Sequence, residues 1–239
     1  MIKKNQDIAV LIPSAGKGSR SKLNYPKTLY KVNKIPILIR ILKKVSKYTK
    51  YFSVVINQDF DFLYFDVIKK YRINNVEFLY QNQPFGMGDA ILKFMDSQNF
   101  IDVSDILLIW GDVPFVSRKS LDALIYNHYK YKNYMTILSI YSKNPYTMII
   151  KDQNGFIKKI HETHKSKKKF KFGERDIGVF IFKKELLLEL KKYKKVYNNE
   201  HNFLYIINYL YRKGLNIKSL PIDNKKESIS FNKFQDLYF

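Results

Sequence analysis

The chain has 239 residues, of which 46% are hydrophobic and 16% aromatic, which is enough to bury one large core. It contains no Cys, so disulfides and thiolate metal sites are excluded and the cytoplasm is the expected compartment. No apolar run approaches the roughly 18 to 20 residues that a bilayer crossing needs. We therefore expect no membrane partner.

The formal net charge is +22, and such an excess is typical of proteins that bind nucleic acid or anionic surfaces. The lysines are spread over the whole chain among Asn, Ile, Tyr and Phe, as an AT-rich coding bias would produce. The densest cluster, residues 165–171, lies between two apolar stretches and predicts a solvated loop. We expect no nucleic-acid partner, although a basic nucleic-acid-binding protein remains the alternative from another class.

The first half of the chain alternates between strands and helices. The apolar run over residues 8–12 predicts a buried strand that opens into a glycine loop. The next expected elements are a helix over 35–48 with Pro36 in its first turn, strands over 52–56 and 76–80 with a helix over 62–71 between them, a helix over 87–95, a strand over 106–110 and a helix over 121–131. This alternation predicts an α/β fold with a mostly parallel, Rossmann-like sheet and helices on both faces.

From residue 135 onward the pattern changes to hairpin-like strands. They are expected over 136–142 and 147–162, with a turn at residues 153–155. A strand over 179–182, helices over 184–194 and 202–213, and a strand over 217–220 complete the chain. No linker or repeat interrupts it, so we expect a single domain over 1–239.

The first loop, after the strand over 8–12, concentrates groups that suit phosphate binding. Glycines let backbone N–H groups approach a phosphate closely, and Arg20 and Lys27 can neutralise its oxygens. The spacing matches neither the P-loop nor the dinucleotide fingerprint. An ordinary strand-to-helix turn with incidental basic residues is the alternative interpretation.

Three segments in order carry a family resemblance: PSAGKGSRSKLNYPKTL (13–29), YQNQPFGMGDAI (80–91) and WGDVPFV (110–116). They resemble the sugar-phosphate nucleotidyltransferases, and most closely the N-acetylglucosamine-1-phosphate uridylyltransferase domains of that family. The resemblance implies the nucleotide-diphospho-sugar transferase fold, with a nucleotide-binding half over 1–134 and a small β-rich acceptor-binding lobe within 135–239. Because the chain ends at Phe239, we expect no hexapeptide-repeat acyltransferase domain.

The resemblance also implies roles for individual residues. The nucleotide would lie against Pro13, Ser14, Ala15, Gly16, Lys17, Gly18, Gln81, Gly86, Met87 and Gly111, the catalytic groups would be Arg20, Lys27 and Asp112, Mg²⁺ would bind Asp112 and Asn232, and the acceptor would contact Thr147, Glu162 and Asp176. Each has a plainer interpretation: Asp112 as a turn cap, Gln83 in place of Gln81, and Asn232 as a turn residue. Glu162 and Asp176 are solvated acidic residues in that interpretation.

The implied chemistry agrees with the residue types. An acceptor phosphate carries about −1.5 to −2 charge near pH 7, so it can attack the α-phosphorus of a nucleoside triphosphate without a Ser, Cys or His nucleophile. The protein must align two anions and supply positive charge, which Arg20, Lys27 and a Mg²⁺ on oxygen ligands would do. We therefore predict an NMP transfer that releases pyrophosphate.

Three departures from the nearest pattern affect specificity: Met87 replaces Thr, Thr147 replaces Gly, and Asp176 replaces Asn. Asp176 adds negative charge, which suits an acceptor with an amine. We predict UTP or CTP as donor and a sugar 1-phosphate as acceptor, for surface polysaccharide. A cytidylyltransferase acting on a non-sugar phosphorylated metabolite, and a catalytically silent relative that binds a nucleotide, stay open, as does homo-oligomer formation.

Overall fold

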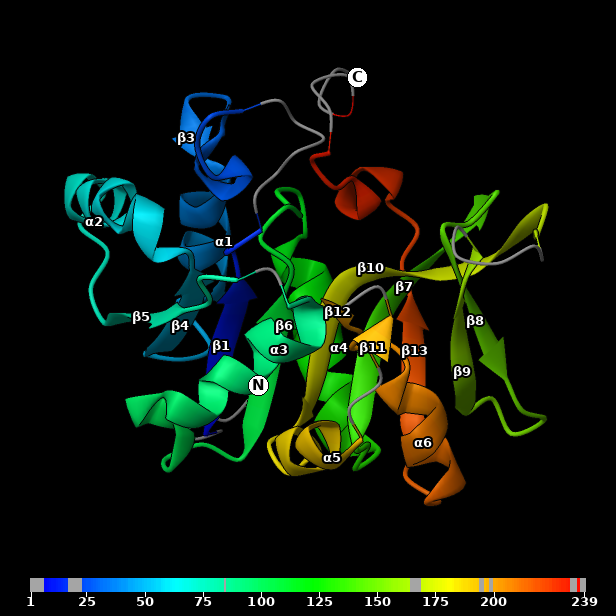
Figure 1. Ribbon diagram of the computed structural model, residues 1–239. Coiled ribbons are helices and arrows are strands. Elements are labelled where there is room, and N and C mark those ends of the chain that lie inside the picture. Colours follow the sequence, from blue (N-terminus) through cyan, green and yellow to red (C-terminus); the bar gives the residue numbers. More distant parts are fainter. Residues whose placement is uncertain are drawn as a thin grey trace.

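A seven-stranded sheet forms the centre of the protein, in the strand order β13-β7-β10-β6-β1-β4-β5 (Figure 1). The structure is a computed structural model that describes residues 7–16, 23–83, 85–163, 169–193, 196–197, 200–232 and 236. The strands are β1 (Ile8–Pro13), β4 (Tyr51–Ile56), β5 (Val76–Tyr80), β6 (Asp105–Ile109), β7 (Met135–Lys143), β10 (Phe172–Lys183) and β13 (Ile217–Pro221).

Most of the sheet is parallel. Strands β6, β1, β4 and β5 pair in parallel, as do β13 and β7, whereas β10 runs antiparallel to both of its neighbours. The register of β10 shifts between Asp176 and Phe180. The predicted α/β fold with a mostly parallel sheet is confirmed.

Helices cover both faces because the strand residues alternate between two apolar cores. Ile8, Val10 and Ile12 face the core made with α1 (Ile37–Val45), α2 (Asp61–Lys70) and α4 (Arg118–Lys130). Ala9 and Leu11 face the other core, made with α3 (Met87–Leu92), α5 (Leu186–Lys192) and α6 (Ile206–Arg212). Such period-two alternation, apolar on both sides, is what a sheet buried between two helix layers requires.

Two expected elements differ in detail. Pro36 precedes α1 as its N-cap and pairs in the short hairpin of β2 (Lys31–Val32) with β3 (Ile35–Pro36), so it does not lie in the first turn. The strand expected over 136–142 is β7 of the central sheet, and the actual hairpin is β8 (Thr147–Lys151) with β9 (Ile157–Glu162). Its turn contains Gly155, whose φ is +75°.

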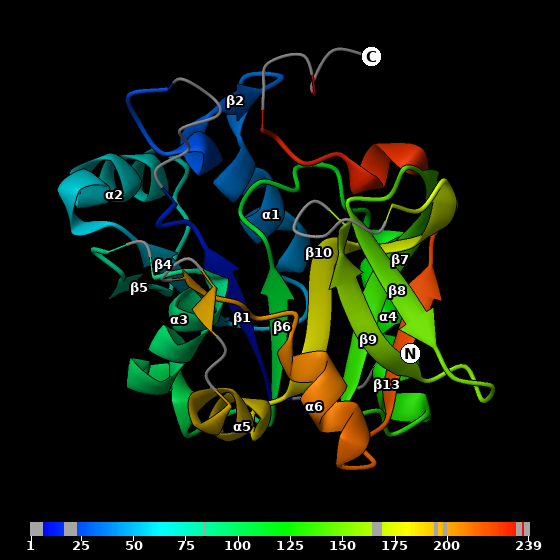
Figure 2. The ribbon, with the colours of Figure 1, turned by 45° about the vertical axis from the view of Figure 1, so that its right-hand side comes forward.

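The β8–β9 hairpin stands beside β10 and against α6 (Figure 2). It forms the small β-rich part of the molecule that the sequence pattern predicts after residue 135. The proposed division of roles at residue 134 stays a prediction. Among the described helices, none combines the length and apolar character needed to cross a membrane.

The carboxyl ends of β1 and β6 meet at one end of the sheet. In Figure 2 both strands point toward the end where the 3-10 helix η7 (Lys225–Ser228, red) lies. Ligands of open α/β sheets bind at this end of the strands. Lys17, Gly18 and Arg20 of the predicted phosphate loop lie outside the described residues.

Candidate active site

A cavity of about 340 Å³ opens at the carboxyl end of β1, and we call it the glycine-loop cavity. Its lining comes from the first loop, the segment after β5 and the segment after β6. The lining residues are Pro13, Ser14, Ala15, Gly16, Lys27, Thr28, Gln81, Gly86, Met87, Ala90, Trp110, Gly111, Asp112 and Glu200. All the described residues to which the sequence assigned the nucleotide therefore lie around one cavity.

Lys27 and Asp112 form an ion pair in the wall of this cavity. Lys27 begins the short 3-10 helix η2 (Lys27–Leu29), which follows Pro26, and its Nζ bonds Oδ2 of Asp112. The other carboxylate oxygen, Oδ1, is buried and has no hydrogen-bond partner within the described part of the chain. A buried carboxylate oxygen without a partner is energetically unfavourable unless a ligand or cation completes it.

The loop after β6 can approach the first loop because Gly111 has no side chain. A Cβ at Gly111 would lie 2.5 Å from Cγ2 of Thr28 and 2.8 Å from the carbonyl oxygen of Pro13. On the far side, Lys44 of α1 donates to the carbonyl oxygens of Pro114 (3.1 Å) and Val116 (2.6 Å), and burial lowers the pKa of Lys44 to about 8. These contacts fix the backbone that presents Asp112.

Tyr64 links the first loop after β1 to the 3-10 helix η2. Its hydroxyl lies 2.9 Å from Oγ1 of Thr28 and donates to the carbonyl oxygen of Ser14 at 3.1 Å. Burial raises the pKa of Tyr64, so the phenol stays a neutral donor. The sequence analysis missed this residue, because nothing local to α2 distinguishes it from an ordinary core tyrosine.

At the opposite end of the cavity, Gln81 is held in one orientation. Its Nε2 donates to Oδ2 of Asp89 at 2.8 Å and to the carbonyl oxygen of Gly86 at 3.1 Å. Both partners accept hydrogen bonds, so the NH₂ group must face them whichever way the amide is drawn. Oε1 of Gln81 has no hydrogen bond within the described residues and is the group left for a ligand.

Because Gly86 has no side chain, the segment with Glu200 and His201 can pack against it beside Gln81. Its φ is +96°, and a Cβ there would lie 2.7 Å from the backbone N of His201. The N–H of His201 donates to the carbonyl oxygen of Phe85 at 2.6 Å, and the neighbouring Glu200 lines the cavity. Glu200, 114 positions after Gly86, reaches the site only through the tertiary fold, and the sequence analysis missed it.

A second cavity of about 790 Å³ lies beside the first, and we call it the β10 cavity. Trp110 and Asp112 line both cavities. The remaining lining residues are Ser142, Lys143, Asn144, Tyr146, Thr147, Arg175, Asp176, Ile177, Ser228, Ile229, Ser230, Asn232 and Asp236. Asp112 thus stands at the junction of two compartments that could hold two substrates.

Thr147 and Asp176 are joined in the wall of the β10 cavity. The Thr147 hydroxyl donates to Oδ1 of Asp176 at 2.5 Å, and the Gly178 N–H donates to Oδ2 at 3.2 Å. Burial raises the pKa of the Asp176 carboxyl, and these hydrogen bonds and the charge of Arg175 oppose that shift only in part. Gly178 in turn packs on Trp110, where a Cβ would lie 2.7 Å from the indole ring.

Glu162 and Asn232 are placed differently from each other. Glu162 is 8% exposed and accepts from Nδ2 of Asn202 at 2.5 Å; it is the cross-strand partner of Thr147 but does not line the β10 cavity. Asn232 does line it, because the preceding Phe231 N–H donates to the carbonyl oxygen of Asp112 at 2.8 Å. The backbone of the tail is thereby bound next to Asp112, and the magnesium pair of Asp112 and Asn232 stays a prediction.

This geometry agrees with the sequence family of the chain. Residues 10–193 match the family described as the MobA-like NTP transferase domain. The chain belongs to this family. It is therefore a nucleotidyltransferase, as the three ordered motifs predicted.

The chain is also similar to individual curated proteins over most of its length. The bifunctional protein GlmU of Pseudothermotoga lettingae is 28% identical over 237 residues, which cover 94% of this chain and 51% of that protein. The GlmU of Buchnera aphidicola is 31% identical over 97% of this chain and 49% of its own length. The chain thus spans about half the length of these curated relatives.

Solved structures share the fold at low sequence identity. A putative glucose-1-phosphate thymidylyltransferase from Bacillus anthracis superposes with a TM-score of 0.74 at 17% identity, over 90% of this chain and 87% of that one. The 4-diphosphocytidyl-2C-methyl-D-erythritol synthase of Anaerococcus prevotii gives 0.66 at 18% identity, over 97% and 95%. The predicted nucleotide-diphospho-sugar transferase fold is confirmed.

Proposed function

We propose that this enzyme transfers the NMP unit of a pyrimidine nucleoside triphosphate, UTP or CTP, to a sugar 1-phosphate and releases pyrophosphate. The product would be an activated precursor for surface polysaccharide, made in the cytoplasm. The observation that carries the proposal is the position of Asp112, which lines both cavities and is paired with Lys27. A carboxylate and a cation at such a junction are suited to bring two phosphorylated substrates together.

The two cavities suit different substrate parts. The nucleoside would occupy the glycine-loop cavity, with its base near Gln81 and its phosphates toward Lys27 and Asp112. The acceptor would occupy the β10 cavity, with its phosphate toward Asp112 and the rest of the molecule near Thr147 and Asp176. Since Trp110 and Asp112 line both cavities, the reacting phosphates would meet beside them.

The residues around Asp112 fit a magnesium ion. Oδ1 of Asp112 is buried without a hydrogen-bond partner among the described residues, and the amide of Asn232 lines the same cavity. Two oxygen ligands from the protein are enough for Mg²⁺, because this ion keeps several waters and binds few protein carboxylates plus substrate phosphates. Bound there, it would neutralise phosphate charge and orient both substrates.

The chain's own groups would then align the reaction. An acceptor phosphate oxygen attacks the α-phosphorus, the bond from that phosphorus to the bridging oxygen of the β-phosphate breaks, and pyrophosphate leaves. Lys27 would hold positive charge at the α-phosphate, where negative charge builds, and the predicted Arg20 would do so along the triphosphate. No proton transfer to a side chain is needed, because the acceptor phosphate is already ionised.

A pyrophosphate-release assay tests the proposal. The purified protein is incubated with each of the four NTPs, Mg²⁺ and a panel of sugar 1-phosphates, alcohol phosphates and amino-sugar phosphates. We expect release with UTP or CTP and one class of acceptor, reduced about 10²- to 10³-fold by Asp112→Asn. The matched control is Asp122→Asn, which removes a carboxylate from the exposed Lys47–Asp122 ion pair, and Asp122 lines neither cavity.

The same panel addresses a second candidate, a cytidylyltransferase that acts on a non-sugar phosphorylated metabolite. Asp176 favours it, because a buried carboxylate in the β10 cavity suits an acceptor with an amine. Asp176→Asn should then change the order of acceptors more than the affinity for NTP. Release that never exceeds the Asp112→Asn level with any pair would refute the enzyme proposal in both forms.

A further inference from the structure

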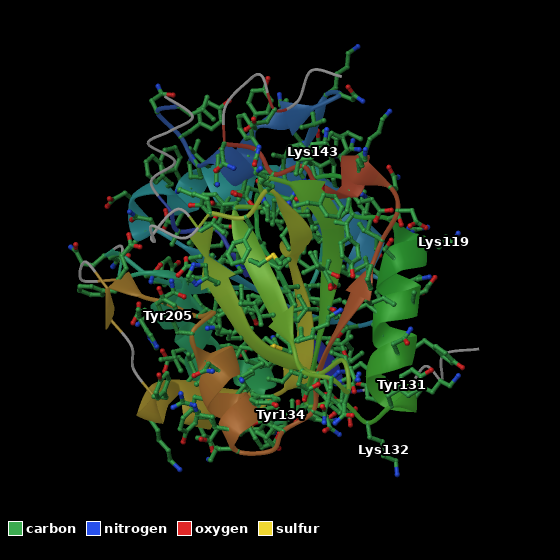
Figure 3. All side chains as sticks on the ribbon, turned by 90° about the vertical axis from the view of Figure 1, so that its right-hand side faces the viewer. Lys119, Tyr131, Lys132, Tyr134, Lys143 and Tyr205 are labelled. Atoms are coloured by element: carbon green, nitrogen blue, oxygen red, sulfur yellow. The ribbon has the colours of Figure 1, made fainter. Side chains whose placement is uncertain are left out.

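The β10 cavity contains two cationic side chains that the proposed reaction does not use, Lys143 and Arg175. Lys143 ends β7, and Arg175 lies on the neighbouring strand β10. Figure 3 shows Lys143 at the same end of the sheet as η7 (red). Both residues lie outside the three motif segments 13–29, 80–91 and 110–116.

Arg175 is a half-buried cation that lacks a carboxylate hydrogen-bond partner. Two of its five N–H donors are bound to backbone carbonyl oxygens, that of Asp176 at 3.0 Å and that of Ser228 at 3.2 Å. Burial lowers the pKa of the guanidinium, and the nearby charge of Asp176 offsets this only in part. Asp176 is the anion that acts on the guanidinium, but the hydrogen bonds of Arg175 within the described residues go to carbonyl oxygens and to no carboxylate.

The acidic residues of the same cavity are engaged elsewhere. Asp176 accepts from Thr147 and Gly178, Oδ2 of Asp112 is bound to Lys27, and Oδ2 of Asp236 accepts the Asn232 N–H at 2.8 Å. Lys143 is exposed and has no ion pair or hydrogen bond to the described residues. Oγ of Ser142, another lining residue, is buried and without a described partner. Two cations and one hydroxyl are therefore available to a ligand.

We propose that Arg175 and Lys143 bind a second anionic group on the acceptor, a carboxylate or a further phosphate, in addition to the phosphate that reacts. The inference rests on the proposed function, since it concerns the acceptor of that reaction. A guanidinium that lines a cavity and keeps donors outside its described hydrogen bonds is well suited to bind a carboxylate or phosphate through two hydrogen bonds. The acceptor class is thus an acidic sugar 1-phosphate or a sugar bisphosphate.

Matched acceptor pairs test this directly. Glucose 1-phosphate is compared with glucuronic acid 1-phosphate, and galactose 1-phosphate with galacturonic acid 1-phosphate, because each pair differs only in the carboxylate. Glucose 1,6-bisphosphate distinguishes a second phosphate from a carboxylate. With UTP and with CTP, we expect kcat/KM about tenfold to a hundredfold higher for an acidic acceptor than for its neutral counterpart, the range of a charge-assisted hydrogen bond.

Variants locate the effect. Arg175→Gln and Lys143→Glu should each reduce the acidic-to-neutral ratio toward one, while Arg175→Lys should keep part of it. Lys159→Gln is the matched control, because it removes a positive charge from the exposed side of β9 outside the cavity and should leave the ratio unchanged. If Arg175→Gln disturbs the Ser228 segment and lowers activity on both acceptors, Lys143→Glu decides, since its side chain makes no described contact.

The outcomes separate this inference from the proposed function. Equal kcat/KM for the acidic and neutral members of both pairs and for the bisphosphate would overturn it while leaving the nucleotidyltransferase reaction intact. A preference for acidic acceptors that survives unchanged in Arg175→Gln and Lys143→Glu would also overturn it. Absence of pyrophosphate release with every acceptor would instead refute the proposed function.

Discussion

Strand β6 places an aspartate near each of its ends, and the fold surrounds the two in opposite ways. Asp105, its first residue, is fully buried and accepts from Nε2 of His128 at 2.9 Å, from Nζ of Lys183 at 3.0 Å and from the hydroxyl of Tyr129 at 3.0 Å. Asp112, just beyond the other end, is bound through one oxygen to Lys27, and its other oxygen is buried without a described partner. A satisfied carboxylate stabilises the fold, and an unsatisfied one is available for a ligand.

The largest expected effect on stability comes from removing Asp105, the carboxylate whose hydrogen bonds are satisfied. Asp105→Ala would leave His128 and Lys183 without their common acceptor, and losing one member of a buried pair lowers the free energy of unfolding by about 3 to 5 kcal/mol. Urea unfolding followed by circular dichroism measures it. Pyrophosphate release at low temperature should persist, since this cluster lies at the opposite end of β6 from Asp112.

Two further variants serve as controls for the Asp105→Ala measurement. Asp122→Ala breaks the exposed Lys47–Asp122 pair and should change the unfolding free energy by no more than about 1 kcal/mol. Asp105→Asn keeps the size of the side chain if the alanine variant does not fold. A loss for Asp105→Asn no greater than that for Asp122→Ala would show that the buried cluster does not stabilise the protein.

The unsatisfied end should behave in the reverse way. Asp112→Asn should leave the free energy of unfolding within about 1 kcal/mol of the native value, because the change removes a charge that is only half compensated. Its activity should fall about 10²- to 10³-fold. Thermal unfolding of the two proteins side by side measures the first quantity, and a stability loss as large as that of Asp105→Ala would remove the distinction between the two ends.

Much of this arrangement is visible in the sequence because it depends on local patterns. Short apolar runs predict the strands, and an acidic residue shortly after the buried strand β6 predicts a ligand site at its carboxyl end. The described nucleotide-site residues do surround one cavity, and Asp112 and Asn232 do share another. The roles assigned to them stay predictions, and so do those of Lys17, Gly18 and Arg20.

What the sequence does not show is set by contacts between distant segments. Tyr64 fastens Ser14 to Thr28 across the fold, and no periodicity within α2 marks it. Arg175 becomes notable only because it lines the β10 cavity and donates to the carbonyl oxygen of the distant Ser228. A proline can occupy the first turn of a helix or the position just before the helix. For Pro36, the pairing of β3 with β2 fixes the second position.

A third carboxylate, Asp89, combines features of Asp105 and Asp112. It is hydrogen-bonded, as Asp105 is, but its partner Gln81 lines the glycine-loop cavity. It orients Gln81, whose Oε1 would accept from a nucleobase N–H group in the proposed function. Asp89→Ala should let the amide rotate and raise the dissociation constant for UTP or CTP about tenfold, the loss of one charge-assisted hydrogen bond. Asp89→Asn should cause a smaller change, because its carbonyl oxygen can accept the same N–H.

Trp110, the single tryptophan of the chain, lines the cavity, so its fluorescence reports binding without acceptor. Equal affinities for native and Asp89→Ala proteins would show that Gln81 needs no such orientation.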